Sequence, residues 1–251
     1  MILKISHVII STVNFEKTID TFCKFGYRPE LIKNKIKNVA IKEKLMRKYS
    51  KTQSLAILRK KGSYSVELVD HDHFFDERSC YMPVFEGVSP QVINTNTKIS
   101  LAGEDLVSGI MTPIGIPAFF SLRSSPEIRF NKLCVTSPNT KKTASFFQNL
   151  GFKVLAKDKN FIKLKFTSPI DLSSYELYVI SGKKIGCFLD NVGANCVSFI
   201  CTSAENERKI LDRKFEVTEI EQIKLEKTLN IFFARGPFEE LVEIIEPTGG
   251  K

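Results

Sequence analysis

Two of the three histidines in this sequence stand close together, in the run DHDH at positions 70–73. Alternate residues of a strand share one face, so His71 and His73 could hold a metal ion together. The other interpretation is a polar loop that follows a strand. A short run of charged and polar residues is more typical of a loop, so the loop is the expectation here.

His7, the third histidine, stands in an otherwise apolar stretch, 2–11, with the period-two pattern of a strand. That pattern by itself favours a core histidine bonded to a neighbour. Glu67 is flanked by Val66 and Leu68, which face the opposite side of a strand, so its carboxylate points away from the apolar layer. A neutral imidazole and a carboxylate can both hold a divalent ion, and both can move a proton.

The elements that must position these side chains belong to an internal repeat. Residues 5–27 and 130–152 align without a gap at an offset of 125. Each copy predicts a buried strand, then a helix that begins after an asparagine (Asn14 or Asn139) and ends at a glycine. The apolar residues inside each helix recur at helical spacing, which indicates one buried face.

Strands predicted after each helix complete βαβββ modules. The expected strands are 27–32, 54–59 and 64–69 in the first module, 152–155, 161–166 and 175–180 in the third, and 195–202, 217–225, 229–234 and 239–245 in the fourth. In the degenerate second module they are 90–95, 107–111 and 118–122, with a helix remnant at 101–106. One module exposes an apolar sheet face, so modules must pair. The expected fold class is α+β, with four βαβββ modules in two domains, 1–125 and 126–251.

The formal net charge of +9 is concentrated in one segment, 33–51, which holds eight Lys and Arg and one Glu. The tetrapeptides 65–68 and 174–177 match at an offset of 109, so the first module carries an insertion of 16 residues there. The segment could bind an anionic ligand or nucleic acid. A solvated helix is the favoured alternative, because no aromatic stacking platform is interleaved with the charges.

Composition narrows the class of protein. A hydrophobic share of 43% supports a packed core rather than disorder. The six cysteines form no CxxC pair, so we expect reduced thiols in a cytoplasmic protein. No apolar run is long enough for a membrane span, and the start lacks the layout of a signal peptide. Nucleophile-elbow, phosphate-loop and dinucleotide motifs do not occur.

Residues 7–27, HVIISTVNFEKTIDTFCKFGY, resemble the opening of vicinal-oxygen-chelate proteins, the superfamily of glyoxalases, bleomycin-resistance proteins and extradiol dioxygenases. Residues 232–247, FFARGPFEELVEIIEP, are similar to the hairpin that closes a domain in that superfamily. The resemblance implies curved sheets in which two modules face each other and form a cup. It also implies metal ligands on the first and last strand of each module.

Carried over position by position, the resemblance implies His7, Glu67 and Gln91 as ligands of a divalent metal (Fe, Mn, Ni or Zn) in the first domain. The set is incomplete beside the usual His-His-Glu or four-ligand arrangement. In the second domain the matching positions are Lys132, Glu176, the neighbourhood of Cys196, and Glu243. A protonated lysine cannot ligate a metal, so Lys132 would stand between the two glutamates as a counter-charge.

The resemblance implies a small molecule bound in the cup, with an anionic ligand among the candidates. An enzyme of this kind would use the metal as a Lewis acid in lyase, isomerase or dioxygenase chemistry, with Glu67 or Glu243 as the catalytic base. The alternative is a protein that sequesters an antibiotic or metabolite without metal or catalysis. An adaptor for nucleic acid or acidic proteins, acting through 33–51, is a third and less favoured class. No membrane partner is expected, and the chain is expected to be a monomer or homodimer.

Overall fold

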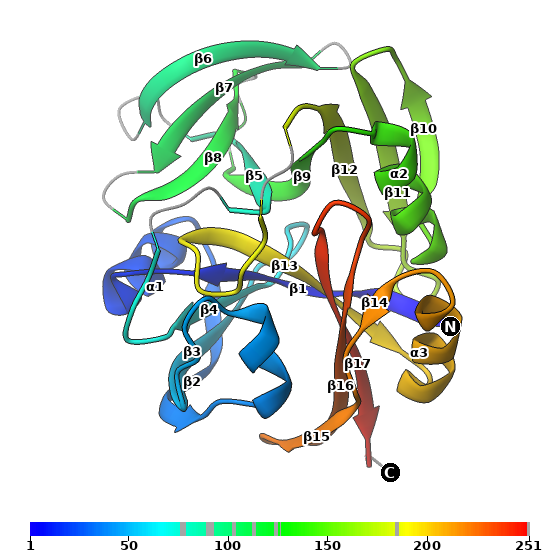
Figure 1. The fold of residues 1–251 in the computed structure, drawn as a ribbon. Coiled ribbons are helices and arrows are strands. Elements are labelled where there is room, and N and C mark those ends of the chain that lie inside the picture. Colours follow the sequence, from blue (N-terminus) through cyan, green and yellow to red (C-terminus); the bar gives the residue numbers. More distant parts are fainter. Residues whose placement is uncertain are drawn as a thin grey trace.

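The computed structural model describes residues 1–75, 79–88, 93–101, 104–111, 114–122, 125, 127–183 and 186–249, without the side chains of 93–99. Strands dominate these residues. Helix α1 lies at one side of the molecule, and α2 and α3 lie at the other (Figure 1). The chain is thus of the expected α+β class.

The first module has the predicted order. Its elements are β1 (Ile2–Ser11), α1 (Phe15–Lys24), β2 (Arg28–Lys37), the 3-10 helix η1 (Ala40–Leu45), β3 (Thr52–Arg59) and β4 (Val66–Asp70). Helix α1 buries Phe15, Ile19 and Phe22, the residues whose spacing predicted its inner face. Gly26 follows the helix with φ +86°, a conformation that favours glycine and ends the helix.

The third and fourth modules also follow the predicted order. The third contains β9 (Arg129–Ser137), α2 (Thr140–Asn149), β10 (Lys153–Lys157), β11 (Phe161–Thr167) and β12 (Ser174–Ser181). The fourth contains β13 (Gly193–Cys201), α3 (Ala204–Asp212), β14 (Glu216–Val217), β15 (Glu221–Lys224), β16 (Thr228–Arg235) and β17 (Leu241–Thr248). Asn139 caps α2, because its Oδ1 accepts a hydrogen bond from the Lys142 amide at 3.1 Å.

The second module differs from the prediction. It contains β5 (Tyr81–Glu86), β6 (Ile93–Leu101), β7 (Glu104–Met111) and β8 (Ile116–Ser121). The helix remnant expected at 101–106 is wrong, because Leu101 and Glu104 pair at the end of a β6–β7 hairpin. Of the strand expected at 90–95, residues 93–95 belong to β6 and residues 90–92 lie outside the described residues, whereas β5, which leads the module, was not predicted. Pro83, in the middle of β5, hides this strand from sequence analysis, because proline is rare inside strands.

Strand pairing decides which modules face each other. Strand β1 runs antiparallel to β13, so the first module joins the fourth. Strand β5 runs antiparallel to β9 in the same way, so the second module joins the third. Both pairings cross position 125, where the sequence analysis places a domain boundary. Among the described strands, one register pair, Ala194 of β13 with Tyr81 of β5, continues the sheet from one pair of modules to the other.

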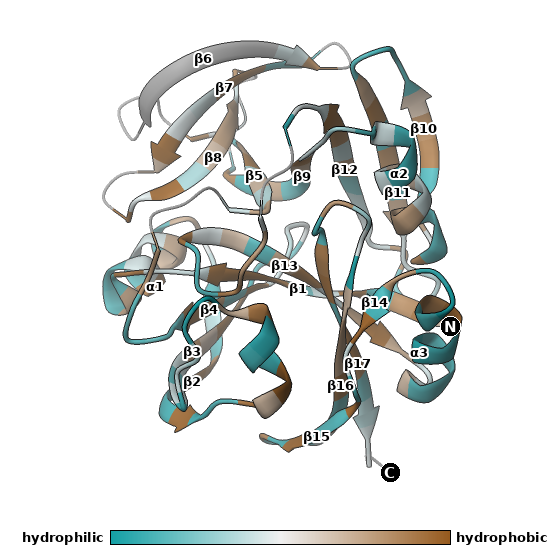
Figure 2. Ribbon diagram, viewed as in Figure 1, coloured by the Kyte–Doolittle hydropathy of each residue, from teal (hydrophilic) through white to brown (hydrophobic). Residues whose placement is uncertain are grey.

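The core extends through both pairs of modules. Apolar residues alternate along the strands, as the brown segments in Figure 2 show, and the largest buried cluster contains residues from all four modules. Phe22 of α1, Phe85 of β5 and Phe130 of β9 belong to it, with Phe85 and Phe130 ring centroids 5.0 Å apart. None of the helices within the described residues is long and apolar enough to cross a membrane.

Two of the six cysteines form a disulfide, Cys80–Cys187, so the expectation that all are reduced is wrong. The two residues are 107 positions apart in sequence, and they meet only because the loops before β5 and β13 come together. Cys23, Cys134, Cys196 and Cys201 are free. The cytoplasmic location stays a prediction. The argument for it from six reduced cysteines no longer applies, because disulfides are rare in cytosolic proteins.

Candidate functional site

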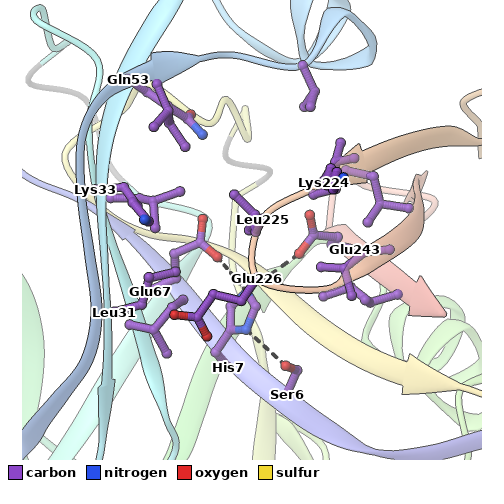
Figure 3. A pocket seen from close by; sticks show the side chains of 18 of the residues that line it. Ser6, His7, Leu31, Lys33, Gln53, Glu67, Lys224, Leu225, Glu226 and Glu243 are labelled. Carbon is purple, nitrogen blue, oxygen red and sulfur yellow. Dashed lines mark hydrogen bonds and ion pairs between the residues drawn. The ribbon is translucent and has the colours of Figure 1, made fainter. Parts of the chain in front are cut away.

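A cup of about 670 Å³ lies between the first and fourth modules. Strands β1 to β4 supply one side, and β13 with β15 to β17 supplies the other (Figure 3). Its walls combine aliphatic side chains, such as Leu31, Leu55, Ile231 and Ile245, with charged side chains of both signs. A concave apolar space with a few polar groups on its lining is the usual form of a small-molecule site.

Three side chains from three strands meet at the floor of this cup. His7 Nε2 lies 2.9 Å from Glu67 Oε2 and 3.5 Å from Glu243 Oε2. In Figure 3 both carboxylates point at the imidazole from opposite sides. The side chains of His7, Glu67 and Glu243 are 8%, 12% and 7% exposed, so this is a buried charge cluster with a narrow opening to the cup.

The register of the sheet explains why these residues meet. Strand β1 runs parallel to β4 and antiparallel to β13, and β13 runs parallel to β17. His7 is the partner of Ser198, and Ser198 is the partner of Glu243. His7, Ser198 and Glu243 therefore form one row across the sheet, and Glu67 lies on β4 beside Ile9, two residues from His7 on β1. Ser198 Oγ donates a hydrogen bond to Glu243 Oε2 at 2.6 Å, which orients that carboxylate beside the imidazole.

The sequence analysis placed Glu243 in the wrong context and located the first-strand position of the fourth module only approximately. Glu243 was expected beside Lys132 in the second domain, whereas the structure brings it to His7. The neighbourhood of Cys196 was expected to supply the first-strand position of the fourth module. Ser198 occupies that position opposite His7, and the Cys196 side chain is fully buried. Which modules pair decides the place of Glu243, and the register of β1 with β13 decides that Ser198 stands opposite His7. Sequence spacing carries no information about either.

The charges at the floor of the cup depend on one another. Burial alone would lower the pKa of His7, but Glu67 and Glu243 raise it to about 9. Burial alone would raise the pKa of Glu67, but the charges of His7 and Lys42 bring it below its usual value. Ser6 Oγ lies 3.0 Å from His7 Nδ1 and holds the other side of the ring. The cluster therefore contains a charged imidazolium at neutral pH when it is metal-free.

The donor atoms partly fit a divalent metal. His7 Nε2 is buried and makes no well-aligned hydrogen bond, although two carboxylate oxygens stand near it. Ligands about 2.1 Å from one metal ion are roughly 3 to 3.5 Å apart, which is close to the spacing seen here. Among the residues that the structure describes, however, no three His, Cys, Asp or Glu side chains form a complete metal-binding group. Gln91, the third ligand expected from the sequence, lies outside the described residues.

The corresponding position between the second and third modules holds a lysine. Lys132 Nζ lies 2.7 Å from Glu86 Oε1 and within 2.9 Å of both oxygens of Glu104. The idea of a lysine counter-charge is thus confirmed, but its expected partners are wrong. Glu176 pairs with Lys163 at 2.9 Å instead. Burial would lower the pKa of Lys132, and the two carboxylates raise it.

The other two histidines form no metal group with the rest of the described chain. His71 and His73 follow the end of β4, as the loop interpretation predicted, and their ring centroids are 6.2 Å apart. His71 is nevertheless buried, and His73 Nε2 lies 3.3 Å from Asp190 Oδ2. The loop therefore packs against the segment that precedes β13.

Sequence analysis missed one residue of the cup altogether. Lys42 belongs to the basic segment that was expected to be a solvated helix, and most lysines of that segment are exposed. Lys42 is only 4% exposed and lines the cup. The sequence feature that could have indicated this is the helical spacing of Ile41 and Leu45. It predicts a helix face that packs against the protein, and Lys42 lies next to that face.

Several solved structures resemble this chain, and three of them extend over nearly all of it. A variant of glyoxalase I from Zea mays has a TM-score of 0.69 at 12% identity, over 97% of this chain and 92% of that one. Glyoxalase I from Zea mays has a TM-score of 0.64 at 13% identity, over the same shares of 97% and 92%. A Bacillus subtilis protein provisionally assigned as a dioxygenase has a TM-score of 0.64 at 15% identity, over 99% and 86%. No protein-family model and no curated protein sequence matches the chain.

These likenesses extend over nearly the whole chain, and they agree with the paired βαβββ modules and with the cup between two of them. At such low identity they concern the fold, because one fold supports many reactions. The chain therefore has the vicinal-oxygen-chelate fold, the fold of the glyoxalases and the proteins related to them.

Proposed function

We propose that this chain binds a small molecule in the cup between the first and fourth modules and acts on it with a divalent metal. The observation that supports this most is the meeting of His7 Nε2 with one oxygen each of Glu67 and Glu243, at 2.9 and 3.5 Å, on the floor of an apolar cup. Lyase, isomerase and dioxygenase chemistry are the reaction classes that this arrangement suits.

His7, Glu67 and Glu243 would hold the ion, and Fe, Mn, Ni and Zn all accept imidazole and carboxylate ligands. When bound, such an ion supplies a Lewis acid for neighbouring oxygens of the substrate. Ser198 fixes Oε2 of Glu243 and leaves Oε1 to accept a proton from the substrate. Glu67 keeps its charge because the charges of His7 and Lys42 hold its pKa low. The aliphatic walls would exclude water from the reacting end of the ligand.

The second candidate is a protein that sequesters its ligand without metal or catalysis. The protonated His7 between two carboxylates favours it, because an imidazolium neutralises much of the negative charge that would otherwise require a metal. Such a protein needs only the apolar cup and a few polar anchors. The ligand in both cases is a small molecule. Lysines at the mouth (Lys33, Lys37 and Lys224) stand among glutamates (Glu30 and Glu226), so it is the buried Lys42 on the lining that favours an anionic ligand.

Metal analysis of protein purified without an affinity tag separates the two candidates. The enzyme requires close to one ion per chain, lost in His7→Ala and in Glu243→Gln. Lys132→Arg is the matched control, because it keeps the charge of a buried group outside the cup. Metal content near zero, together with no calorimetric signal on addition of Fe²⁺, Mn²⁺, Ni²⁺ or Zn²⁺, would rule out the metal-dependent enzyme and support the sequestering protein.

A further inference from the structure

The insertion that distinguishes the first module from the third forms a bridge across the cup. We call residues 38–51 the strap. At its start, the amides of Ala40 and Ile41 donate to Oε1 and Oε2 of Glu221 on β15, at 3.4 and 3.0 Å. Glu221 belongs to the fourth module, so the strap leaves one wall of the cup and is held by the other.

The far end of the strap is fixed to the segment that leads into β13 of the fourth module. The amides of Arg47 and Lys48 donate to Oδ1 and Oδ2 of Asp190, at 2.9 and 3.0 Å. The Leu189 amide donates to the carbonyl oxygen of Leu45 at 2.9 Å. Asp190 is 1% exposed, so these are buried, charge-assisted contacts that hold the strap in one position.

Lys42 lies between these two attachments, on η1. Its neighbours Leu45 and Met46 are buried at 2% and 6% exposure, which holds the helix against the protein. Its ammonium has one hydrogen-bond acceptor, Gln53 Oε1, at 3.5 Å. Within the described part of the chain no carboxylate lies within ion-pair distance of Lys42, and its charge reaches Glu67 only through space, where it helps to lower the pKa of that carboxyl. An ammonium has three donors, so most of its hydrogen-bonding capacity is unused.

A buried charge with unused donors is costly unless a partner of opposite sign completes it. Lys33, Lys37 and Lys224 at the mouth are exposed to water, so their charges have no such cost of burial. An anion that enters the cup therefore gains most at Lys42. Gln53, its acceptor, lies across the cup from His7 in the view of Figure 3. On β3, Leu55 lies between Gln53 and Ile57, the register partner of Glu67, so aliphatic side chains of the lining stand between Gln53 and the cluster at His7.

We propose that the ligand of this cup is an apolar molecule with one anionic group, and that the strap delivers Lys42 as the residue that binds this group. A carboxylate, sulfonate or phosphate would meet the Lys42 ammonium and the Gln53 amide. The apolar body would lie between the walls, and the far end would reach His7, Glu67 and Glu243. The inference rests on the proposed function in one respect, that this cup is the ligand site. It holds both for a metal-dependent enzyme and for a sequestering protein.

Two fluorescent probes that differ in one group provide the test. Anilinonaphthalene sulfonate and phenylnaphthylamine share a skeleton, and only the first carries an anion. We expect wild-type protein to bind the sulfonate more tightly, and Lys42→Met to weaken the sulfonate about tenfold or more while leaving the neutral probe unchanged. Lys44→Met is the matched control, because Lys44 stands on the same short helix but is exposed. It should change neither affinity more than about twofold.

A second variant separates the failure of this inference from failure of the cup as ligand site. Leu31→Trp fills the cup from β2, so it should abolish binding of both probes. If wild-type protein binds neither probe, or if Leu31→Trp leaves both bound, the proposed site and the inference both fail. If Leu31→Trp abolishes both but Lys42→Met leaves the ratio of the two affinities unchanged, the role of Lys42 is overturned and the cup stands.

A measurement on the wild-type protein covers the case in which Lys42→Met does not fold. Phenylbutyrate and phenylbutyramide have the same shape and differ in charge. The acid should displace the bound neutral probe at a concentration about tenfold below that of the amide. Equal potency of the two compounds would overturn the assignment of an anionic ligand.

Discussion

His7 on β1 and Ser198 on β13 are register partners across the antiparallel strands that join the first module to the fourth. The hydroxyl of Ser198 binds Glu243, so the row across the sheet contains an imidazole, a hydroxyl and a carboxylate. A hydroxyl is a weak ligand for divalent metals of the Fe, Ni and Zn type, whereas an imidazole is a strong one. Ser198 is therefore the residue that leaves the ligand set at the cup incomplete.

Replacing Ser198 with histidine should complete that set. Ser198→His would place a second imidazole opposite His7, beside the two carboxylates, and should tighten Zn²⁺ or Ni²⁺ binding on the order of tenfold or more. Calorimetric titration of untagged protein measures the change. Ser198→Ala, which removes the hydroxyl and adds no ligand, should show no gain. A folded Ser198→His protein with unchanged affinity would contradict the geometry of this row.

The pKa of His7 gives the metal-free protein a pH-dependent stability. Because the folded pKa of about 9 is above the ordinary value of 6.5, the stabilisation is fully present below pH 6.5 and is lost as the pH rises through 9. The loss should be on the order of 3 kcal/mol in the free energy of unfolding. Urea denaturation at pH 6.5, 8 and 10 measures it. His7→Gln should flatten this part of the profile, and an equally steep profile in that variant would assign the effect to other groups.

Lys132 should be a major stabilising residue of the second and third modules. Lys132→Met leaves Glu86 and Glu104 close together without their cation, which should cost about 3–5 kcal/mol in the free energy of unfolding. Chemical denaturation measures the loss. Lys153→Met, at an exposed position of β10, should change stability little. Adding Glu104→Gln to Lys132→Met should recover part of the stability, and no recovery would contradict a charge-based origin.

The disulfide should be detectable by counting thiols. Four of the six cysteines should react with a thiol reagent in denaturant, and all six after reduction. Because Cys80 and Cys187 are 107 residues apart, loss of the bond should cost about 4–5 kcal/mol in the chain-entropy description. Cys80→Ser with Cys187→Ser, compared by denaturant unfolding with Cys23→Ser, measures that cost. Six reactive thiols before reduction would show that the bond does not form.

Local features of the chain were predictable because they depend on residues close together in sequence. The helix that buries Phe15, Ile19 and Phe22, and its copy after Asn139, follow from apolar spacing, an asparagine start and a glycine stop. The βαβββ order of three modules follows in the same way. Prediction failed in the second module, where Pro83 interrupts the apolar pattern of β5, although Tyr81 and Phe85 are fully buried.

The residues of the candidate site also differ in whether local sequence could predict them. His7 and Glu67 were predictable because both belong to the first module, where the parallel pairing of β1 and β4 is built into the βαβββ unit. The position of Glu243 beside them was not predictable, because it depends on the first module joining the fourth. Lys42 was hidden because a lysine in a basic run is usually solvated, and only the contacts of the strap with Asp190 and Glu221 turn it inward.

By itself, the sequence determined the repeated unit, its strand and helix order, and two of the side chains on the floor of the cup. Hydrophobic periodicity and capping act over a few residues, so one sequence is sufficient to show them. The tertiary structure alone decided which modules join, that Glu243 completes the floor, and that the strap closes over it. Those outcomes depend on which apolar faces bury each other across more than a hundred residues, and local spacing carries no record of that choice.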